Sequence, residues 1–186
     1  MSRPAPAEPR LSHEEYLEME AASPVKHEYV AGYIYAMTGT SDTHNLISLN
    51  LASILRNHLK GSPCRVFIAD VKAKLAQADA YYYPDVMVYC EKSASAYFRE
   101  QPILIMEVLS SSTAKFDAND KRRDYQTLAS LQEYVLISQE CMDVRVWRRA
   151  ESGDWTTTIY TDGMVVPLTS VDLPIPIEQI YEEVWT

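Results

Sequence analysis

YYYPDVMVYC (81–90) and PILIMEVLS (102–110) are two apolar stretches that a short polar segment separates. Within each stretch the apolar residues follow one another instead of alternating with polar ones, so both faces are hydrophobic. Strands that are covered on both sides of a sheet have this pattern. We therefore predict two central strands, over 81–90 and 102–109, in a sheet that is packed on both faces.

The segments around this pair alternate between helical and strand patterns. Ser12 and Glu15 form a capping box ahead of one short helix, and Ser41 or Asp42 can cap a longer one with a stripe of Leu46, Leu49, Ile54, Leu55 and Leu59. The predicted helices cover 13–20, 42–60 and 117–129, with a short one near the C-terminus. The other predicted strands are a hairpin within 27–37 and the segments 64–75, 133–138, 143–149 and 155–161. This order predicts a mixed α/β sheet flanked by helices, with an added antiparallel hairpin.

Length and composition limit the class of protein. The 186 residues suit one domain, which we expect over 11–186 after a flexible, proline-rich tail at 1–10. The formal net charge of −9 argues against a protein that coats nucleic acid nonspecifically, because that requires a basic surface. An enzyme that holds cations and contacts a short length of backbone stays compatible with it.

Cysteine usage and hydropathy bear on the compartment. Cys64, Cys90 and Cys141 form no CxxC pair, so we expect reduced, mostly buried thiols and no zinc site. We find neither the pattern of a signal peptide nor an apolar run that would span a bilayer. We therefore expect a cytoplasmic protein that has no membrane partner.

Two acidic residues interrupt the central apolar stretches. Asp85 and Glu107 are each surrounded by apolar neighbours, and an isolated buried carboxylate costs several kcal/mol unless it is paired or metal-bound. An ion pair can account for Glu107, and a turn can account for Asp85 after its proline. Both acids in one sheet would repel each other, and a cation between them removes that repulsion. Magnesium accepts one or two carboxylates and keeps several waters, so we predict that this pair is a magnesium site.

A cation is also expected beside these acids. A lysine two residues after Glu107 would share its face of the strand, but Leu109 occupies that position. In the predicted helix over 117–129, Lys121 shares a stripe with Tyr125 and Leu128, a face that suits packing on the sheet. Lys121 is therefore the cation best placed to point inward, although a solvated charge-rich first turn is an alternative.

Several motifs together resemble one known family. YYPDVMV (82–88), EVLSSST (107–113), D-x-x-x-K-x-x-x-Y (117–125) and LQEYVLI (131–137) are similar to the Uma-type family of restriction endonucleases. EYVAGYIY (28–35) and the threonine-containing segment that ends at His44 extend the resemblance over nearly the whole chain. That family is placed in the PD-(D/E)XK nuclease superfamily.

The resemblance implies a role for each matching position. Asp85 is the motif aspartate, Glu107 the motif glutamate, and Lys121 the lysine displaced onto the helix. Glu28 is a candidate further acid of the metal site. His44 is a candidate donor to a phosphate or to a ligating water. Both also have plain structural interpretations, as an exposed hairpin acid and as a histidine at a helix terminus.

Three functions are compatible with these residues. The first is a magnesium-dependent endonuclease, with manganese as a possible substitute, that hydrolyses phosphodiester bonds in DNA. The second is a catalytically inactive binding or regulatory module with a nuclease fold, which the acidic balance and Leu109 favour. The third is a metal-dependent hydrolase of small phosphate esters, which suits the net charge. The resemblance also implies a homodimer, because double-strand cleavage in this superfamily usually needs two active sites.

Overall fold

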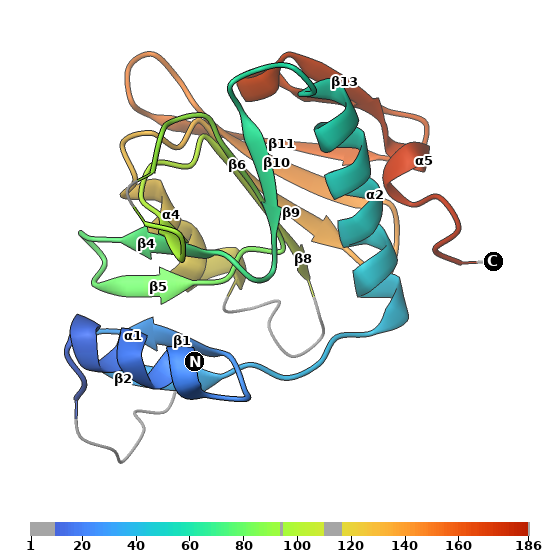
Figure 1. Ribbon diagram of the computed structural model, residues 1–186. Coiled ribbons are helices and arrows are strands. Elements are labelled where there is room, and N and C mark those ends of the chain that lie inside the picture. The colour runs from blue at the N-terminus through green and yellow to red at the C-terminus, as the bar shows by residue number, and fades with distance from the viewer. Residues whose placement is uncertain (1–9, 94, 110–116, 186) are drawn as a thin grey trace.

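A computed structural model of the protein describes residues 10–93, 95–109 and 117–185 (Figure 1). Its centre is a six-stranded sheet with the order β11-β10-β9-β8-β6-β3. The two middle strands β8 and β9 are parallel, and the other neighbouring pairs are antiparallel. The strands are β3 (Arg65–Ile68), β6 (Val86–Tyr89), β8 (Leu104–Leu109), β9 (Glu133–Ser138), β10 (Asp143–Arg149) and β11 (Trp155–Thr161). The predicted mixed sheet is confirmed, and the predicted bounds of its last three strands are those observed.

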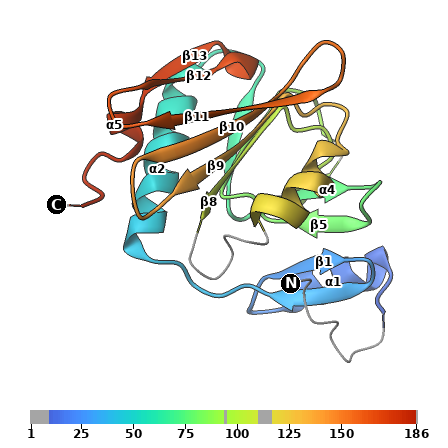
Figure 2. The same ribbon diagram turned by 180° about the vertical axis from the view of Figure 1, so that it is seen from behind.

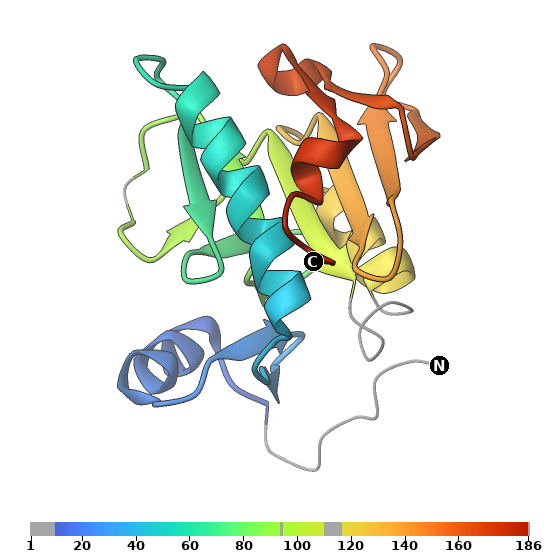
Figure 3. The same cartoon turned by 90° about the vertical axis from the view of Figure 1, so that its right-hand side faces the viewer.

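One face of the central sheet is covered by α2 (Asp42–His58), which crosses the sheet as Figure 3 shows. Ile47, Leu51 and Leu55 of this helix are fully buried against Val86 and Met106 of the sheet. The C-terminal segment completes this layer. It consists of β12 (Val165–Leu168), the 3-10 helix η2 (Thr169–Val171), β13 (Leu173–Pro176) and α5 (Ile177–Ile180). Their apolar side chains join the same core, so α2 is held from both sides.

The opposite face packs on a short helical segment and a second sheet. A π-helix η1 (Asp117–Lys121) leads into α4 (Arg122–Gln126), which Figure 2 shows beside β4 and β5. The second sheet has the order β2-β1-β5-β4-β7. Its strands are β1 (His27–Val30), β2 (Tyr33–Ala36), β4 (Lys72–Leu75), β5 (Ala80–Tyr82) and β7 (Phe98–Arg99). Tyr125, Leu75 and Ile105 meet in the core between these layers.

The N-terminal helix α1 (His13–Ala22) lies against the hairpin of β1 and β2 (Figure 1). The predicted capping box is present, with mutual bonds between Ser12 and Glu15. Ala31 and Gly32 of the hairpin turn have φ angles of 50° and 90°, and this conformation favours glycine. A Cβ on Gly32 would also lie 2.8 Å from Arg10 Cβ. The rest of the predicted tail, residues 1–9, lies outside the described residues.

Two predicted strands are each divided in the structure. Segment 64–75 forms β3 and β4, and segment 81–90 forms β5 and β6, in each case with one half in each sheet. The first division falls at Ala69, whose φ is 29°, and the second falls at Pro84 and Asp85. Both halves of 81–90 are buried, so their hydrophobic pattern is continuous although the backbone changes sheet. We had predicted Asp85 within a strand. The structure instead places it in a bend before β6.

Two other predictions need correction. The helix expected over 117–129 ends at Gln126 and begins with a π-turn. The buried stripe of α2 includes Ile47 and Leu51, whereas Leu49 is 56% exposed. The predicted stripe was thus rotated toward solvent on one side, because it included Leu49 and left out Ile47 and Leu51. No helix in the described residues has the length and apolar character needed to cross a membrane.

The cysteines differ from expectation. Cys64 and Cys90 form a disulfide, and Cys141 is exposed. Arg65 pairs with Tyr89 across β3 and β6, so the two bonded cysteines stand opposite each other one residue beyond the paired strands. Strand register brings them together across 26 positions of sequence, a pairing that spacing alone did not indicate.

Candidate active site

Asp85 and Glu107 stand across from each other at one end of β6 and β8. Val86 pairs with Met106 in an antiparallel register, which places the preceding Asp85 opposite the following Glu107. Asp85 itself lies in the bend before β6, so the register opposes the two backbone positions and leaves the Asp85 side chain free to turn toward α2. The Glu107 side chain is 5% exposed and that of Asp85 is 18% exposed. The two predicted acids therefore share one end of the central sheet, with Asp85 nearer to solvent.

The carboxylate of Asp85 is held by two donors. Its Oδ2 accepts a hydrogen bond from the backbone N–H of Val108 at 2.8 Å. Its Oδ1 lies 2.9 Å from Nε2 of His44, in the first turn of α2. Ser41 caps that turn by accepting from the His44 N–H at 3.1 Å. The start of α2 thus orients the histidine, and the histidine orients the acid.

The other ring nitrogen of His44 faces away from Asp85. Nδ1 is buried and has no hydrogen-bond partner within the part of the chain that the structure describes. If Nε2 donates to Asp85, a neutral ring leaves Nδ1 as an acceptor, and a protonated ring makes it a second donor. His44 therefore has an unused polar atom next to the acids. The plain interpretation as a helix-terminus histidine does not explain this arrangement.

Glu107 is surrounded by groups from the η1–α4 segment. Tyr125 donates to Glu107 Oε1 at 3.0 Å, and Lys121 Nζ lies 3.7 Å from the same oxygen. Lys121 Nζ also lies 2.7 Å from Oε1 of Glu28, a residue of β1 that is 4% exposed. Glu28 is therefore a buried acid and not an exposed hairpin residue. The alternative of an ion pair at Glu107 is also realised, through Lys121.

The charges in this cluster do not cancel. Lys121 is one ammonium beside two buried carboxylates, Glu28 and Glu107, and Asp85 adds a third acid. Among the described residues of the cluster, acids thus outnumber ammonium groups, and burial makes an excess of one charge costly.

Tyrosines form the apolar wall of the site. The Tyr82 ring lies 5.3 Å from Lys121 Nζ, and its hydroxyl donates to Asp124 Oδ2 at 2.5 Å. Burial, and then the charge of Glu107, raises the pKa of Tyr125 well above its ordinary value. Burial, and then Asp124, likewise raises the pKa of Tyr82. Both hydroxyls therefore stay protonated and act as donors.

Sequence reasoning had named five of these residues and missed three. Asp85, Glu107, Lys121, Glu28 and His44 come from five separate elements or bends, and the contacts above link them in two groups. Tyr125, Tyr82 and Asp124 were missed as site residues. Tyr125 had been taken as packing because it shares an apolar stripe with Leu128. Leu109, at the usual lysine position, packs at the edge of the core beside α4.

The donor set of the site fits magnesium better than a softer metal. The ligand candidates are carboxylate oxygens, and no sulfur atom takes part. Among residues 10–93, 95–109 and 117–185, no group of three or more His, Cys, Asp or Glu side chains is arranged to hold a metal. Magnesium typically takes only one or two carboxylates and completes its shell with water.

The architecture and this end of the sheet define a restriction-endonuclease-like protein. A mixed sheet covered by helices on both faces carries opposed acids with a lysine beside them. The model of the family Uma2, described as "Putative restriction endonuclease", matches residues 13–177. The chain belongs to this family.

Two relatives and one solved structure are similar to the chain. Two proteins of Synechocystis, both described as uncharacterized, are similar to the chain. The protein slr1290 is 37% identical over 93% of this chain and 92% of its own length. The protein sll1609 is 36% identical over 80% of this chain and 86% of its own. A crystal structure from Anabaena variabilis, described as "a putative nuclease belonging to DUF820", has a TM-score of 0.78 and covers 94% of this chain and 99% of that one. Its sequence identity is 18%, so this likeness shows the fold.

Proposed function

We propose that the chain is a magnesium-dependent endonuclease that hydrolyses phosphodiester bonds in DNA. The observation that carries this proposal is the opposition of Asp85 and Glu107, with Lys121 Nζ 3.7 Å from Glu107. Membership of a restriction-endonuclease family supports the same reaction class. The three residues are proposed as the catalytic set, and the two acids as the metal ligands.

Each residue has a separate task in this proposal. Magnesium, or manganese in its place, supplies water activation and neutralises charge on the phosphate. Asp85 and Glu107 hold the ion through carboxylate oxygens. Lys121 directs its ammonium toward the phosphate and stabilises the charge that develops there. Its neighbours Glu28 and Tyr82 keep the ammonium at the buried end of the cluster until substrate arrives.

His44 and Glu28 are proposed as supporting residues. His44 fixes the carboxylate plane of Asp85 through Nε2 and leaves Nδ1 to bond a phosphate oxygen or a ligating water. Glu28 sets the position of Lys121. It is also a candidate to accept a hydrogen bond from a water that is bound to the metal. Such partners of metal ligands tune affinity and geometry without binding the ion themselves.

The remaining parts of the proposal concern substrate and setting. DNA is the proposed substrate, with two copies of the chain acting as a homodimer so that both strands of a duplex are cut. A cytoplasmic location suits such an enzyme. The family assignment supports a nucleic acid as the substrate, and the choice of DNA is tested against RNA and nucleotides below.

The decisive experiment compares two matched variants. Asp85→Asn removes a ligand charge but keeps an acceptor for the Val108 N–H. Asp79→Asn makes the same chemical change at a site that contacts His13. Supercoiled DNA, RNA and nucleotides are incubated with each purified protein and magnesium. We expect cleavage of DNA by the wild type and Asp79→Asn, and at least a hundredfold loss in Asp85→Asn, in keeping with about 2.7 kcal/mol or more of transition-state stabilisation.

Circular dichroism establishes that each variant is folded. Wild-type rates from a folded Asp85→Asn protein would contradict the proposed site. Cleavage of nucleotides but not of DNA would instead favour a hydrolase of small phosphate esters.

An inactive binding module is the second candidate function. It is favoured by Leu109 at the usual lysine position and by the close contact of Lys121 with Glu28, which neutralises the only ammonium of the described cluster. Calorimetric titration with magnesium and manganese separates the two. Heat of binding at millimolar metal that disappears in Asp85→Asn favours the enzyme, and its absence in the wild type favours the module.

A further inference from the structure

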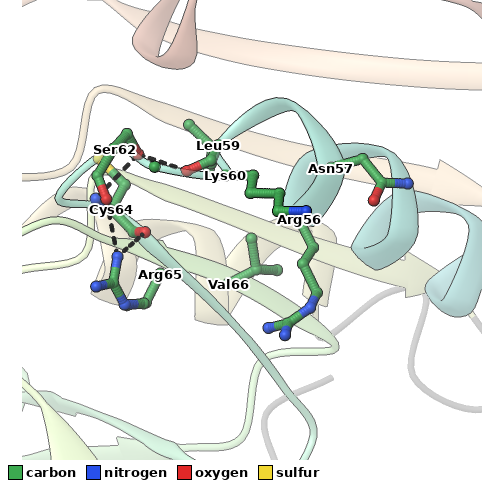
Figure 4. A pocket seen from close by; sticks show the side chains of 9 residues that line it. Arg56, Asn57, Leu59, Lys60, Ser62, Cys64, Arg65 and Val66 are labelled. Atoms are coloured by element: carbon green, nitrogen blue, oxygen red, sulfur yellow. Dashed lines mark hydrogen bonds between the residues drawn. The ribbon is translucent and has the colours of Figure 1, made fainter.

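A basic pocket lies at the far end of α2 from the candidate active site. It has a volume of about 390 Å³ and forms where the last turn of α2 and the following loop overlie the edge strand β3. Figure 4 shows the side chains of Arg56, Lys60 and Arg65 around it. His44, which contacts Asp85, lies in the first turn of α2, and Arg56 lies in the last turn of the same helix.

The charge in this pocket has one sign. Its lining contains three cations and no acid, in a chain whose formal net charge is −9. In the described part of the chain, no carboxylate forms an ion pair with Arg56, Lys60 or Arg65. Like charges that share a pocket repel each other, and an anion bound between them removes that repulsion. In a chain with more acids than bases, a group of three cations without a neighbouring carboxylate among the described residues suggests a site for an external anion.

Ordinary structural roles account for part of this cluster only. The C-terminus of a helix carries partial negative charge, which can explain Arg56 and Lys60. Arg65 belongs to β3, and backbone carbonyl oxygens hold its guanidinium in place. Its Nη1 donates to the carbonyl oxygens of Ser62 and Cys64 at 2.9 and 2.8 Å, as Figure 4 shows. These two bonds fix the guanidinium before any ligand binds, which lowers the entropy cost of binding.

The lining suits an anionic group such as phosphate. Arginine and lysine together suit phosphate oxygens, through a planar fork and a compact point charge respectively. No aromatic side chain lines the pocket, so it provides no platform on which a nucleobase could stack. The pocket therefore offers donors for phosphate oxygens and no surface on which a base could stack.

An exposed track connects the pocket with the other end of α2. Asn45, Leu49, Ser53, Arg56 and Lys60 are all exposed, and their spacing places them on one stripe without an acid. Arg56 follows His44 by twelve residues, or about 18 Å along the helix axis. That length corresponds to about five base pairs of duplex at about 3.4 Å each. An extended phosphate backbone suits this track better than a small phosphate compound does.

We propose that Arg56, Lys60 and Arg65 bind backbone phosphates of a nucleic acid, several nucleotides away from the phosphate at the acid cluster. This inference rests on the proposed nuclease function and names a second contact with the same substrate. The contact is independent of base sequence and needs no metal. It explains how an acidic protein holds nucleic acid, since the basic surface is local.

Salt dependence of binding tests this proposal. The full chain is titrated with a short fluorescent DNA duplex in EDTA, over a series of potassium chloride concentrations. The variants are Arg56→Gln and Lys60→Gln, which leave the bonds of Arg65 intact, and Arg145→Gln as a control with the same change of charge. Each pocket variant should lower the slope of log K against log salt by about 0.9, the loss of one phosphate contact. The Arg145→Gln control should keep the wild-type slope.

Several results would overturn the proposal. They are absence of binding by the wild type, wild-type slopes in both pocket variants, or an equal change in Arg145→Gln. Calorimetry with inorganic pyrophosphate distinguishes another source of phosphate. Pyrophosphate binding that Arg56→Gln abolishes, with unchanged DNA slopes, assigns the pocket to a free phosphate compound and refutes the backbone contact. Failure of the proposed nuclease function has a different signature, since DNA then stays uncut in magnesium while the slopes still differ.

Discussion

Lys121 of η1 and Glu28 of β1 form a buried ion pair with 2.7 Å between Nζ and Oε1. The lysine side chain is 9% exposed and that of the glutamate is 5% exposed. The pair joins the η1–α4 segment to the smaller sheet, directly beside Glu107 of the central sheet. One ammonium therefore contacts acids from two sheets. The packing of the two sheets thus depends on a residue of the candidate site.

Replacing Lys121 by methionine should destabilise the protein. The change leaves Glu28 and Glu107 buried without their cation, and removing one partner of a buried pair costs about 3–5 kcal/mol. Urea unfolding at neutral pH measures the loss. Lys92→Met, at an exposed position, is the control and should change the free energy of unfolding by less than about 0.5 kcal/mol. Equal stability of Lys121→Met and wild type would show that the ammonium does not balance these acids.

A second substitution isolates the pair itself. Glu28→Gln removes one carboxylate and should reduce the cost of Lys121→Met, because fewer uncompensated charges stay buried. A double-mutant cycle then gives a coupling energy of about 0.5–3 kcal/mol, typical of residues in contact. Additive effects of the two substitutions would contradict the contact.

His44 should set the metal affinity of Asp85. His44→Asn shortens the side chain and removes the donor that lies 2.9 Å from Asp85 Oδ1. Loss of a hydrogen-bond partner of a metal ligand typically costs about 10–100-fold in affinity. Manganese titration by calorimetry gives this ratio. His58→Asn is a matched control, since His58 ends the same helix and bonds the Val171 carbonyl. If both variants bind manganese equally well, His44 does not position the ligand.

Tyr125 should contribute to unfolding in alkali. Burial raises its folded-state pKa well above the ordinary value, and the charge of Glu107 raises it further. Above about pH 10 the unfolded chain releases the tyrosine proton while the folded protein keeps it. The unfolded state then binds fewer protons, so this contribution is complete below pH 10 and is lost as pH rises further. Near and above that pH, stability should fall by about 1.4 kcal/mol per pH unit for this one group.

Tyr125→Phe tests this assignment. In this variant the free energy of unfolding should fall less steeply as the pH rises. The difference in slope should be that of one proton, about 1.4 kcal/mol per pH unit. Tyr97→Phe, at a position 72% exposed, should leave the decline unchanged. Free energies from urea unfolding over a series of alkaline pH values give both slopes. A wild-type slope in Tyr125→Phe would mean that another group releases the proton.

Local patterns were enough to predict much of the fold. The bounds of β9 follow from a continuous apolar run, and those of β10 and β11 from the polar turn at 151–154 between them; the observed bounds agree. The capping box of α1 is likewise a short-range feature. In contrast, the passage of 81–90 from one sheet to the other depends on packing partners distant in sequence. A continuous apolar run contains no sign of it except Pro84.

Several residues of the candidate site could also be predicted from local sequence patterns. Asp85 and Glu107 are conspicuous because they interrupt apolar stretches, and Lys121 because its helical spacing directs it inward; the structure places all three at one end of the sheet. Their catalytic roles stay a prediction. The hydroxyl contacts of Tyr125 and Tyr82 were not foreseen, since a tyrosine in an apolar stripe contributes packing area in any case. The contact of His44 with Asp85 also needed the docking of α2 on the sheet.

The disulfide between Cys64 and Cys90 should stabilise the fold without taking part in the site. It closes a loop with a sequence separation of 26, for which chain entropy predicts about 3–4 kcal/mol. Cys64→Ser combined with Cys90→Ser should lower the free energy of unfolding by that amount. Cys141→Ser, at an exposed free thiol, is the control and should leave the free energy of unfolding unchanged. Dithiothreitol reduces this bond, so wild type in dithiothreitol should match the double variant. Equal stability of the oxidised and reduced wild type would show that strand pairing of β3 with β6 alone supplies the constraint.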